Sequence, residues 1–228
     1  MGFIVIEGLD GSGKSTQIKY IEEYLLSKNV KTRFIHFPRT DQGIWGELIS
    51  RFLRGDLGKI IEVNPYLVAL IYAGDRKDFA PELLDWKQKG FMVIADRYLY
   101  SNIAFQCAKI SDNSDKEKLA RWIKHLEYEY NQIPIPDLNL FLNVPREFTM
   151  KSLGTRRLGT DRNYLNGGTD IHEADLDFQE RVRETYIWQV RENEDFEMIE
   201  CSDDFGKMLR PVEISKRIIE KIEQKIFE

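Results

Sequence analysis

The chain has 228 residues, a length that suits one compact domain able to bury a core without disulfides or structural metals. Hydrophobic residues make up 42% and charged residues 31% of the sequence, as in an ordinary soluble globular protein. The formal net charge of −5 argues against a general nucleic-acid binder, whose surface would be basic.

Apolar segments and cysteines indicate the cellular compartment of the protein. No window reaches the roughly 18 uninterrupted apolar residues that span a bilayer, and no signal-type segment precedes the first predicted strand. Cys107 and Cys201 have no metal-binding or redox spacing, so we expect buried thiols in a reducing compartment. These features predict a cytoplasmic protein with no membrane or nucleic-acid partner.

Short apolar runs alternate with long amphipathic stretches, a pattern typical of a parallel sheet covered by helices. The predicted strands are Phe3–Glu7, Thr32–Phe37, Phe91–Ala95, Leu138–Val144 and Phe196–Cys201. Their near-continuous apolar character predicts cover on both faces of the sheet. The predicted helices span residues 14–28, 62–89, 115–131, 173–193 and 211–226. The expected fold is therefore a single α/β domain, residues 1–228, with a five-stranded parallel sheet.

The first predicted strand runs into a glycine-rich loop, Gly8-Leu9-Asp10-Gly11-Ser12-Gly13-Lys14-Ser15. It matches G-x-x-x-x-G-K-[ST] between a strand and a helix, which is the context of a P-loop NTPase. Glycines allow backbone N–H groups to curl around a phosphate, and the helix that follows favours an anion at its start. We expect Lys14 to reach the terminal phosphates of a nucleoside triphosphate and Ser15 to ligate Mg²⁺. The predicted nucleotide-binding residues are Gly8, Asp10, Gly11, Ser12, Gly13, Lys14, Ser15 and Thr16.

The second predicted strand ends in Phe37-Pro38-Arg39, which offers a flat aromatic face beside a phosphate contact. Phe37 fits a core position equally well. Together with Arg76 in the next predicted helix, these residues suggest an acceptor pocket with a flat wall and cationic groups. Such a pocket suits a nucleoside monophosphate better than a plain hydroxyl substrate.

The third predicted strand ends in Asp96-Arg97. Ligands of open α/β sheets bind beyond the carboxyl ends of the strands, so both residues should lie beside the phosphate loop. Asp96 is expected to hold Mg²⁺ through water, and Arg97 to clamp a phosphate with two hydrogen bonds. The alternative for Asp96 is a structural ion pair that ends the strand.

Residues 154–170 are rich in glycine and arginine and have no apolar periodicity, which predicts a mobile loop or lid. Its arginines Arg156, Arg157 and Arg162 either close over a bound nucleotide or form a solvated basic loop. Asp170 and Glu173 have the spacing of a capping box for the next helix.

The sequence resembles the thymidylate kinase family over essentially its whole length. The resemblance rests on six motifs in the same order: the Gly8–Ser15 loop, Phe37-Pro38-Arg39, Asp75-Arg76, Asp96-Arg97-Tyr98 with Ser101-Asn102-Ile103-Ala104-Phe105-Gln106, Pro136-Asp137, and Asp170-Ile171-His172-Glu173. It implies a Mg²⁺-dependent kinase that moves the γ-phosphoryl group of ATP to thymidine monophosphate (dTMP). It also implies a homodimer formed by helices beside the acceptor pocket, to which the stretch 62–89 contributes unless its apolar face is core.

The resemblance also implies roles for individual residues. In that family the residue at the position of Phe37 stacks on thymine, that of Arg76 contacts the base, and that of Arg97 binds the acceptor phosphate. The position of Phe105 usually holds a tyrosine whose hydroxyl lies near the sugar, a contact worth about 1 kcal/mol. The implied substrate-binding residues are Phe37, Pro38, Arg39, Arg76, Arg97, Ser101, Asn102, Phe105 and Gln106.

Some family members carry an arginine in the phosphate loop, where this chain has Gly11. The resemblance therefore assigns the catalytic positive charge to the arginines of residues 154–170, and it implicates Asp10 in sugar 3′-hydroxyl or metal contacts. The expected catalytic residues are Asp10, Lys14, Asp96, Arg97, Arg156, Arg157 and Arg162, and the expected Mg²⁺ ligands are Ser15 and Asp96. The loop after the last predicted strand, residues 202–207, is expected to contact adenine.

The expected chemistry is in-line attack of an acceptor phosphate oxygen on the γ-phosphorus. A phosphate monoester is largely ionised at neutral pH, so no general base is required, and His36 and His125 are expected to be structural. Three alternatives stay open at this point: a deoxyribonucleoside kinase, a kinase of another monophosphate such as UMP or CMP, and a nucleotide-binding module without turnover.

Overall fold

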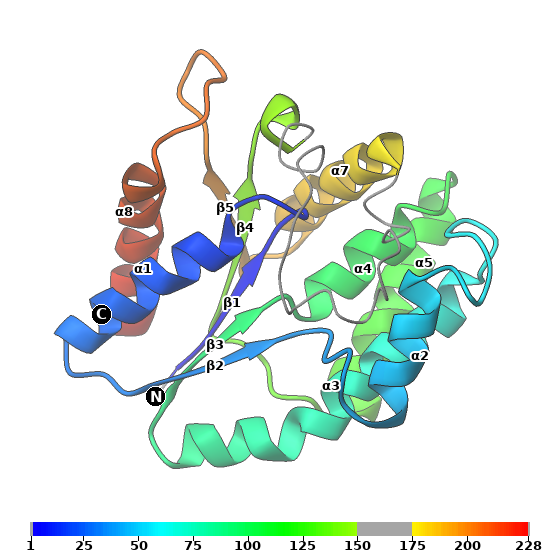
Figure 1. Cartoon of the computed structure of the whole chain (residues 1–228), viewed down its shortest axis with the longest axis horizontal. Coiled ribbons are helices and arrows are strands. Elements are labelled where there is room, and N and C mark those ends of the chain that lie inside the picture. The colour runs from blue at the N-terminus through cyan, green and yellow to red at the C-terminus, as the bar shows by residue number, and fades with distance from the viewer. Residues whose placement is uncertain (1, 150–174, 228) are drawn as a thin grey trace.

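A computed structural model of the chain describes residues 2–149 and 175–227 (Figure 1). A five-stranded parallel sheet has the order β2-β3-β1-β4-β5. The strands are β1 (Phe3–Glu7), β2 (Thr32–His36), β3 (Met92–Asp96), β4 (Leu138–Asn143) and β5 (Phe196–Glu200). All five lie where the sequence predicts them, to within one residue at each end, and the α/β prediction is confirmed.

The described helices and helical turns surround this sheet. They are α1 (Lys14–Ser27), α2 (Gly43–Leu53), α3 (Pro65–Gln88), α4 (Leu99–Cys107), α5 (Asn113–Lys124), α7 (Leu176–Glu192) and α8 (Pro211–Ile222). The π-helix η1 (His125–Tyr130) prolongs α5, and η3 (Glu223–Phe227) prolongs α8. Within the described parts of the chain, no helix combines the length and apolar character needed to cross a membrane.

The predicted stretch 62–89 begins later than expected, at Pro65. Asn64 caps the helix, because its side chain accepts a hydrogen bond from the Tyr66 N–H, and the Pro65 ring suits the first turn. The start of the predicted helix 173–193 lies partly outside the described residues, which resume at residue 175.

Two helices, α2 and α4, were not predicted. Every residue of α4 is buried, so it has no polar face and no amphipathic period to recognise. The buried positions of α2 were a usable signal, but Gly43 and Gly46 in its first turn obscured it.

The edge strand β2 corrects a second expectation. Its residues are exposed or half-buried, with Arg33, Phe34 and His36 open to solvent, so this strand is not covered on both faces. Every residue of β1, β3 and β4 is buried, whereas the edge strand β5 mixes buried, half-buried and exposed residues.

Two hydrophobic layers hold the sheet, one on each face. Alternate residues of β1 point to opposite sides, so Ile4 and Ile6 join the layer under α1 and α8, whereas Phe3 and Val5 join the layer under α3, α4 and α7. Figure 1 shows α1 and α8 together on one side of the sheet and the remaining helices on the other. Because β1 pairs in parallel with β3, with Ile6 opposite Asp96, the carboxyl ends of these two strands lie side by side.

Candidate active site

The phosphate loop leaves the carboxyl end of β1 and ends at Gly13, which immediately precedes α1. Gly13 has φ 89°, a left-handed conformation that residues with a Cβ rarely adopt. From this position its carbonyl accepts hydrogen bonds from the N–H groups of Thr16 and Gln17. The residues after Gly13 therefore enter the helix directly, with Ser15 and Thr16 exposed at its first turn.

Lys14 folds back across the loop. Its Nζ donates hydrogen bonds to the carbonyl oxygens of Gly8, at 3.3 Å, and Leu9, at 3.1 Å, and lies 3.8 Å from Oδ1 of Asp96. Burial lowers the pKa of Lys14, and Arg97 lowers it further, while Asp96 opposes both effects. The ammonium group is thus held at the loop by carbonyl and carboxylate oxygens.

Asp96 ends β3 directly beside this lysine. Its Oδ2 lies 3.2 Å from Nδ1 of His36, and its buried Oδ1 has no hydrogen-bond partner among the described residues. Burial by itself would raise the pKa of Asp96, but Lys14 and His36 outweigh burial and the pKa falls below its ordinary value. Asp96 is thus favoured as a carboxylate.

An ionised carboxylate with an oxygen lacking a hydrogen-bond partner fits Mg²⁺, a cation that takes oxygen ligands and is usually held by one or two carboxylates plus substrate phosphates. A site formed by protein ligands alone would need a cluster of such residues. No group of three or more His, Cys, Asp or Glu residues that could hold a metal occurs in residues 2–149 and 175–227. Asp96 and the exposed hydroxyl of Ser15 are accordingly the residues that would hold the ion.

Arg97 turns the chain out of the sheet with φ 69°, an uncommon left-handed conformation for a residue other than glycine. Its Nη2 donates to Oδ1 of Asp10 at 2.9 Å and its Nη1 donates to Oγ of Ser101 at 3.2 Å. The guanidinium also lies 5.1 Å from the centre of the Phe105 ring. Three predicted site residues, one from the phosphate loop and two from α4, therefore meet around the Arg97 cation.

The Phe37-Pro38-Arg39 segment lies against α3. Phe37 is only 1% exposed and packs beside Phe79 and Tyr98, so the core alternative describes its packing and its stacking on a base stays a prediction. Pro38 follows a cis peptide bond.

The guanidinium of Arg39 is bound to helix α3. It donates hydrogen bonds to the carboxylates of Asp75, at 2.8 Å, and Asp78, at 2.7 Å. Arg39 is therefore engaged with neighbouring carboxylates, and its predicted phosphate contact is not tested by this geometry.

Arg76 is buried as well, with 2% of its surface exposed. Its Nε and Nη2 donate to the two carboxylate oxygens of Glu127 at 2.5 and 2.7 Å. The amide nitrogen of Asn102 donates to the same carboxylate at 2.9 Å and to the carbonyl oxygen of Ala69 at 3.0 Å. Glu127, in the π-helix η1, thus joins two predicted pocket residues, and Gln106 is buried on α4, the helix of Asn102.

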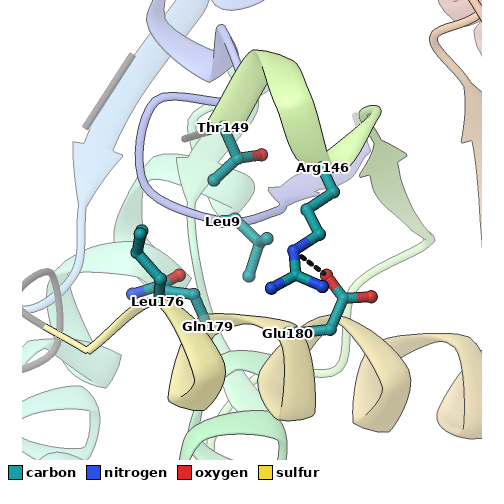
Figure 2. Close-up of a pocket in the computed structure, with 6 residues that line it drawn as sticks. All are labelled: Leu9, Arg146, Thr149, Leu176, Gln179 and Glu180. Carbon is teal, nitrogen blue, oxygen red and sulfur yellow. Dashed lines mark ion pairs between the residues drawn. The ribbon is translucent and has the colours of Figure 1, made fainter. Parts of the chain in front are cut away.

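The expected lid residues Arg156, Arg157 and Arg162 lie outside the described residues, as do Asp170 and Glu173. The segments that flank them border a small pocket beside Leu9 of the phosphate loop (Figure 2). Arg146, which follows β4, faces α7 across this pocket, with ion pairs to Asp177 at 3.6 Å and Glu180 at 4.0 Å. The chain on both sides of the undescribed segment thus lies close to the phosphate loop.

Several residues at the site were missed by sequence reasoning: Glu7, His36, Glu127 and Tyr186. His36 was expected to be structural; its ring contacts Asp96, and its role stays a prediction. Glu7 carried a usable signal, because a charged residue at the end of an apolar strand and next to a phosphate loop is unusual. Tyr186 and Glu127 carried none, since each lies in an amphipathic stretch with no motif.

Comparisons with known proteins identify the family of this chain. A sequence model of the family described as thymidylate kinase matches residues 6–210. A thymidylate kinase from Plasmodium falciparum (isolate 3D7) is 30% identical over 184 residues, which cover 81% of this chain and 75% of that protein. The chain belongs to the thymidylate kinase family.

Other thymidylate kinases extend the comparison. The enzyme of Mycobacterium tuberculosis (strain H37Rv) is 28% identical over 184 residues, covering 80% of this chain and 83% of that protein. A solved thymidylate kinase structure from Candida albicans has a TM-score of 0.69 at 23% identity, covering 98% of this chain and 91% of that chain. This structural likeness shows the shared fold.

Proposed function

We propose that this chain is a dTMP kinase that uses ATP and Mg²⁺ and forms dTDP and ADP. The observation that carries the proposal is the meeting of Lys14, Asp96, Arg97 and Asp10 at the carboxyl edge of β1 and β3. It supplies one cation at the phosphate loop, a second cation for an acceptor phosphate, and a carboxylate between strand and loop for a metal.

In the proposed reaction an oxygen of the dTMP phosphate attacks the γ-phosphorus of ATP in line with the departing ADP oxygen. Arg97 holds the acceptor phosphate, and Lys14 neutralises charge on the transferring group. Mg²⁺, held through Ser15 and Asp96, would neutralise charge on the ATP phosphates. Arg156, Arg157 and Arg162 are proposed to add positive charge as the segment 154–170 covers ATP, with water excluded from the transfer.

The remaining predicted residues form the proposed acceptor and adenine sites. Phe37 is proposed to stack on the thymine and Arg76 to contact it. Asn102 is proposed to line the same pocket. Residues 202–207, which follow β5, are proposed to contact adenine.

The test is an ADP-release assay with ATP and Mg²⁺ in which dTMP, dUMP, UMP, CMP and thymidine are compared as acceptors. Turnover with dTMP far above the others supports the proposal. Turnover with thymidine but not dTMP makes the protein a nucleoside kinase and removes the role given to Arg97. Tight ATP binding without turnover of any acceptor supports a module that binds nucleotide only.

We also propose a cytoplasmic homodimer. Apolar side chains open to solvent on α2 and α3 support an interface there, among them Ile44 at 70% and Leu67 at 59% exposure. Sedimentation equilibrium tests this assembly: a dimer mass for the wild-type chain and a monomer mass for Leu67→Lys support it, whereas a monomeric wild-type chain contradicts it.

A further inference from the structure

We infer that Glu7 and Tyr186 are positioning residues that orient Arg97. Glu7 accepts hydrogen bonds from the hydroxyl groups of Ser101 and Tyr186, and the oxygens of these hydroxyl groups accept from Arg97. The inference rests on the proposed function in one respect, the role of Arg97 as the group that holds the acceptor phosphate. Neither residue belongs to a motif that the sequence singled out for the acceptor site, and they come from opposite ends of the chain.

Glu7 is the last residue of β1 and is 0% exposed. Its Oε2 accepts hydrogen bonds from the hydroxyl groups of Ser101 and Tyr186, the latter at 3.0 Å. Its Oε1 accepts from the backbone N–H groups of Tyr98, at 2.9 Å, and Ser101, at 3.1 Å. Burial raises the pKa of Glu7, which the hydrogen bonds and Arg97 oppose.

The direction of these hydrogen bonds follows from counting protons. An ionised carboxylate only accepts, and a hydroxyl group has a single proton to donate. The oxygens of Ser101 and Tyr186 also lie 2.7 Å apart, so one hydroxyl proton goes to Glu7 and the other goes either to Glu7 or to the neighbouring hydroxyl; in each case a lone pair of both oxygens stays available. Nη1 of Arg97 lies 3.2 Å from the Ser101 oxygen and 3.5 Å from the Tyr186 oxygen.

Arg97 is consequently held on two sides by groups that accept hydrogen bonds from it. Nη1 donates to the hydroxyl oxygens and Nη2 to Asp10, while the ring of Phe105 lies beside the guanidinium. A guanidinium that binds a phosphate with two parallel hydrogen bonds needs its plane fixed beforehand. Glu7 and Tyr186 fix the plane of the Arg97 guanidinium without contacting the phosphate themselves.

Glu7 also holds the backbone at the same corner. Arg97 has φ 69°, and the two N–H groups bonded to Oε1 of Glu7 belong to Tyr98 and Ser101, just after this residue. The carboxylate thus offsets the strain of the turn that brings Arg97 over the loop. A glutamine fills the same volume as Glu7, but its amide N–H₂ group would face hydrogen-bond donors instead of accepting from them.

The experiment compares Tyr186→Phe and Glu7→Gln with a matched control, Tyr100→Phe. Tyr100 is also buried and donates its hydroxyl proton to a carboxylate, Oδ1 of Asp195 at 2.8 Å, but its side chain has no contact with Arg97. Calorimetry measures the affinity of each variant for dTMP and for thymidine, which lacks the phosphate. We expect Tyr186→Phe to weaken dTMP binding about fivefold and to leave thymidine binding unchanged. Glu7→Gln should weaken dTMP binding further, and Tyr100→Phe should alter neither affinity.

Equal losses for dTMP and thymidine, or no loss in Tyr186→Phe, would overturn the inference. In steady-state kinetics the expected change is a higher KM for dTMP with the KM for ATP retained. If Glu7→Gln does not fold, Tyr186→Phe alone decides the question.

A second measurement does not depend on the proposed reaction. NMR of the arginine side chains in the nucleotide-free protein should show the Arg97 guanidinium as rigid, with slowly exchanging protons, assigned by their loss in Arg97→Lys. The Arg97 guanidinium should become mobile in Tyr186→Phe and stay rigid in Tyr100→Phe. A guanidinium that stays rigid in Tyr186→Phe would contradict the inference. A wild-type chain that shows the rigid guanidinium but does not phosphorylate dTMP refutes the proposed function and leaves the positioning intact.

Discussion

Charged residues at the phosphate loop form two opposed pairs, Lys14 with Asp96 and Arg97 with Asp10. The two cations also repel one another, because Arg97 lowers the pKa of Lys14. The carboxylates of Asp96 and Asp10 keep both cations at the edge of the sheet. A bound triphosphate would take over part of the role of these carboxylates as the negative partner of Lys14 and Arg97.

Replacing Asp96 by asparagine is expected to lower turnover at least about 100-fold, because it removes a proposed metal ligand and the carboxylate beside Lys14. The measurement is kcat at saturating ATP and dTMP over a range of Mg²⁺ concentrations. Asp137→Asn is the matched control, since Asp137 accepts from the Phe3 N–H at the other end of β1. An Asp96→Asn enzyme with wild-type kcat would contradict the role of this carboxylate.

Lys109 gives a prediction about stability. Its Nζ is buried 4.8 Å from the centre of the Phe52 ring and has no hydrogen-bond partner among the described residues, and burial lowers its pKa to about 7. The unfolded chain keeps this proton up to about pH 10.5. Between these values the unfolded state binds more protons, so rising pH stabilises the fold.

Lys109→Met should therefore raise the free energy of unfolding most at pH 7 and below, and this gain should shrink as the pH approaches 10. Urea unfolding at pH 6, 8 and 9.5 measures it. The same replacement at Lys19, exposed on α1, serves as the control. A gain that does not depend on pH would contradict the lowered pKa.

At the scale of elements, α2 and α3 meet through a glycine. A Cβ built on Gly74 of α3 would lie 2.5 Å from the indole ring of Trp45 on α2. Alanine favours an isolated helix over glycine by about 1 kcal/mol, but here it would force the two helices apart.

Gly74→Ala should therefore destabilise the protein, by about 1–3 kcal/mol, despite the better helix propensity of alanine. Chemical denaturation of Gly74→Ala, Trp45→Ala and the double variant measures the effect. The alanine at position 74 should cost much less once Trp45 is absent. A more stable Gly74→Ala single variant would show that the ring moves aside freely.

The elements also show what sequence patterns can and cannot predict. The five strands and the phosphate loop were predictable because their signals are local: apolar runs, and glycines at fixed spacing before Lys14. Asp96 and Arg97 were predictable because parallel strands bring their carboxyl ends together. By contrast, α4 is buried on all sides, and Tyr186 meets Glu7 only after the whole chain has folded.

At the scale of the whole molecule, both cysteines are free and buried, as the sequence predicted. Burial raises the pKa of each thiol to about 12, so the reactive thiolate is scarce at neutral pH. We expect no reaction of the native protein with a thiol reagent at pH 8 and two reactive thiols after unfolding in urea. Rapid labelling of the native protein would contradict the burial of these side chains.

The central strand β1 pairs with β3 and β4, which begin at residues 92 and 138, and not with β2, the strand that follows it in sequence. During synthesis β1 is made first, but it cannot gain its second partner until most of the chain has left the ribosome. Until β4 is available, the apolar side chains of β1 and the phosphate loop that follows it lack part of the structure that packs against them. The ability to bind nucleotide should accordingly arise late and abruptly on the growing chain, and nascent chains that end before β4 should depend on chaperones to stay unaggregated.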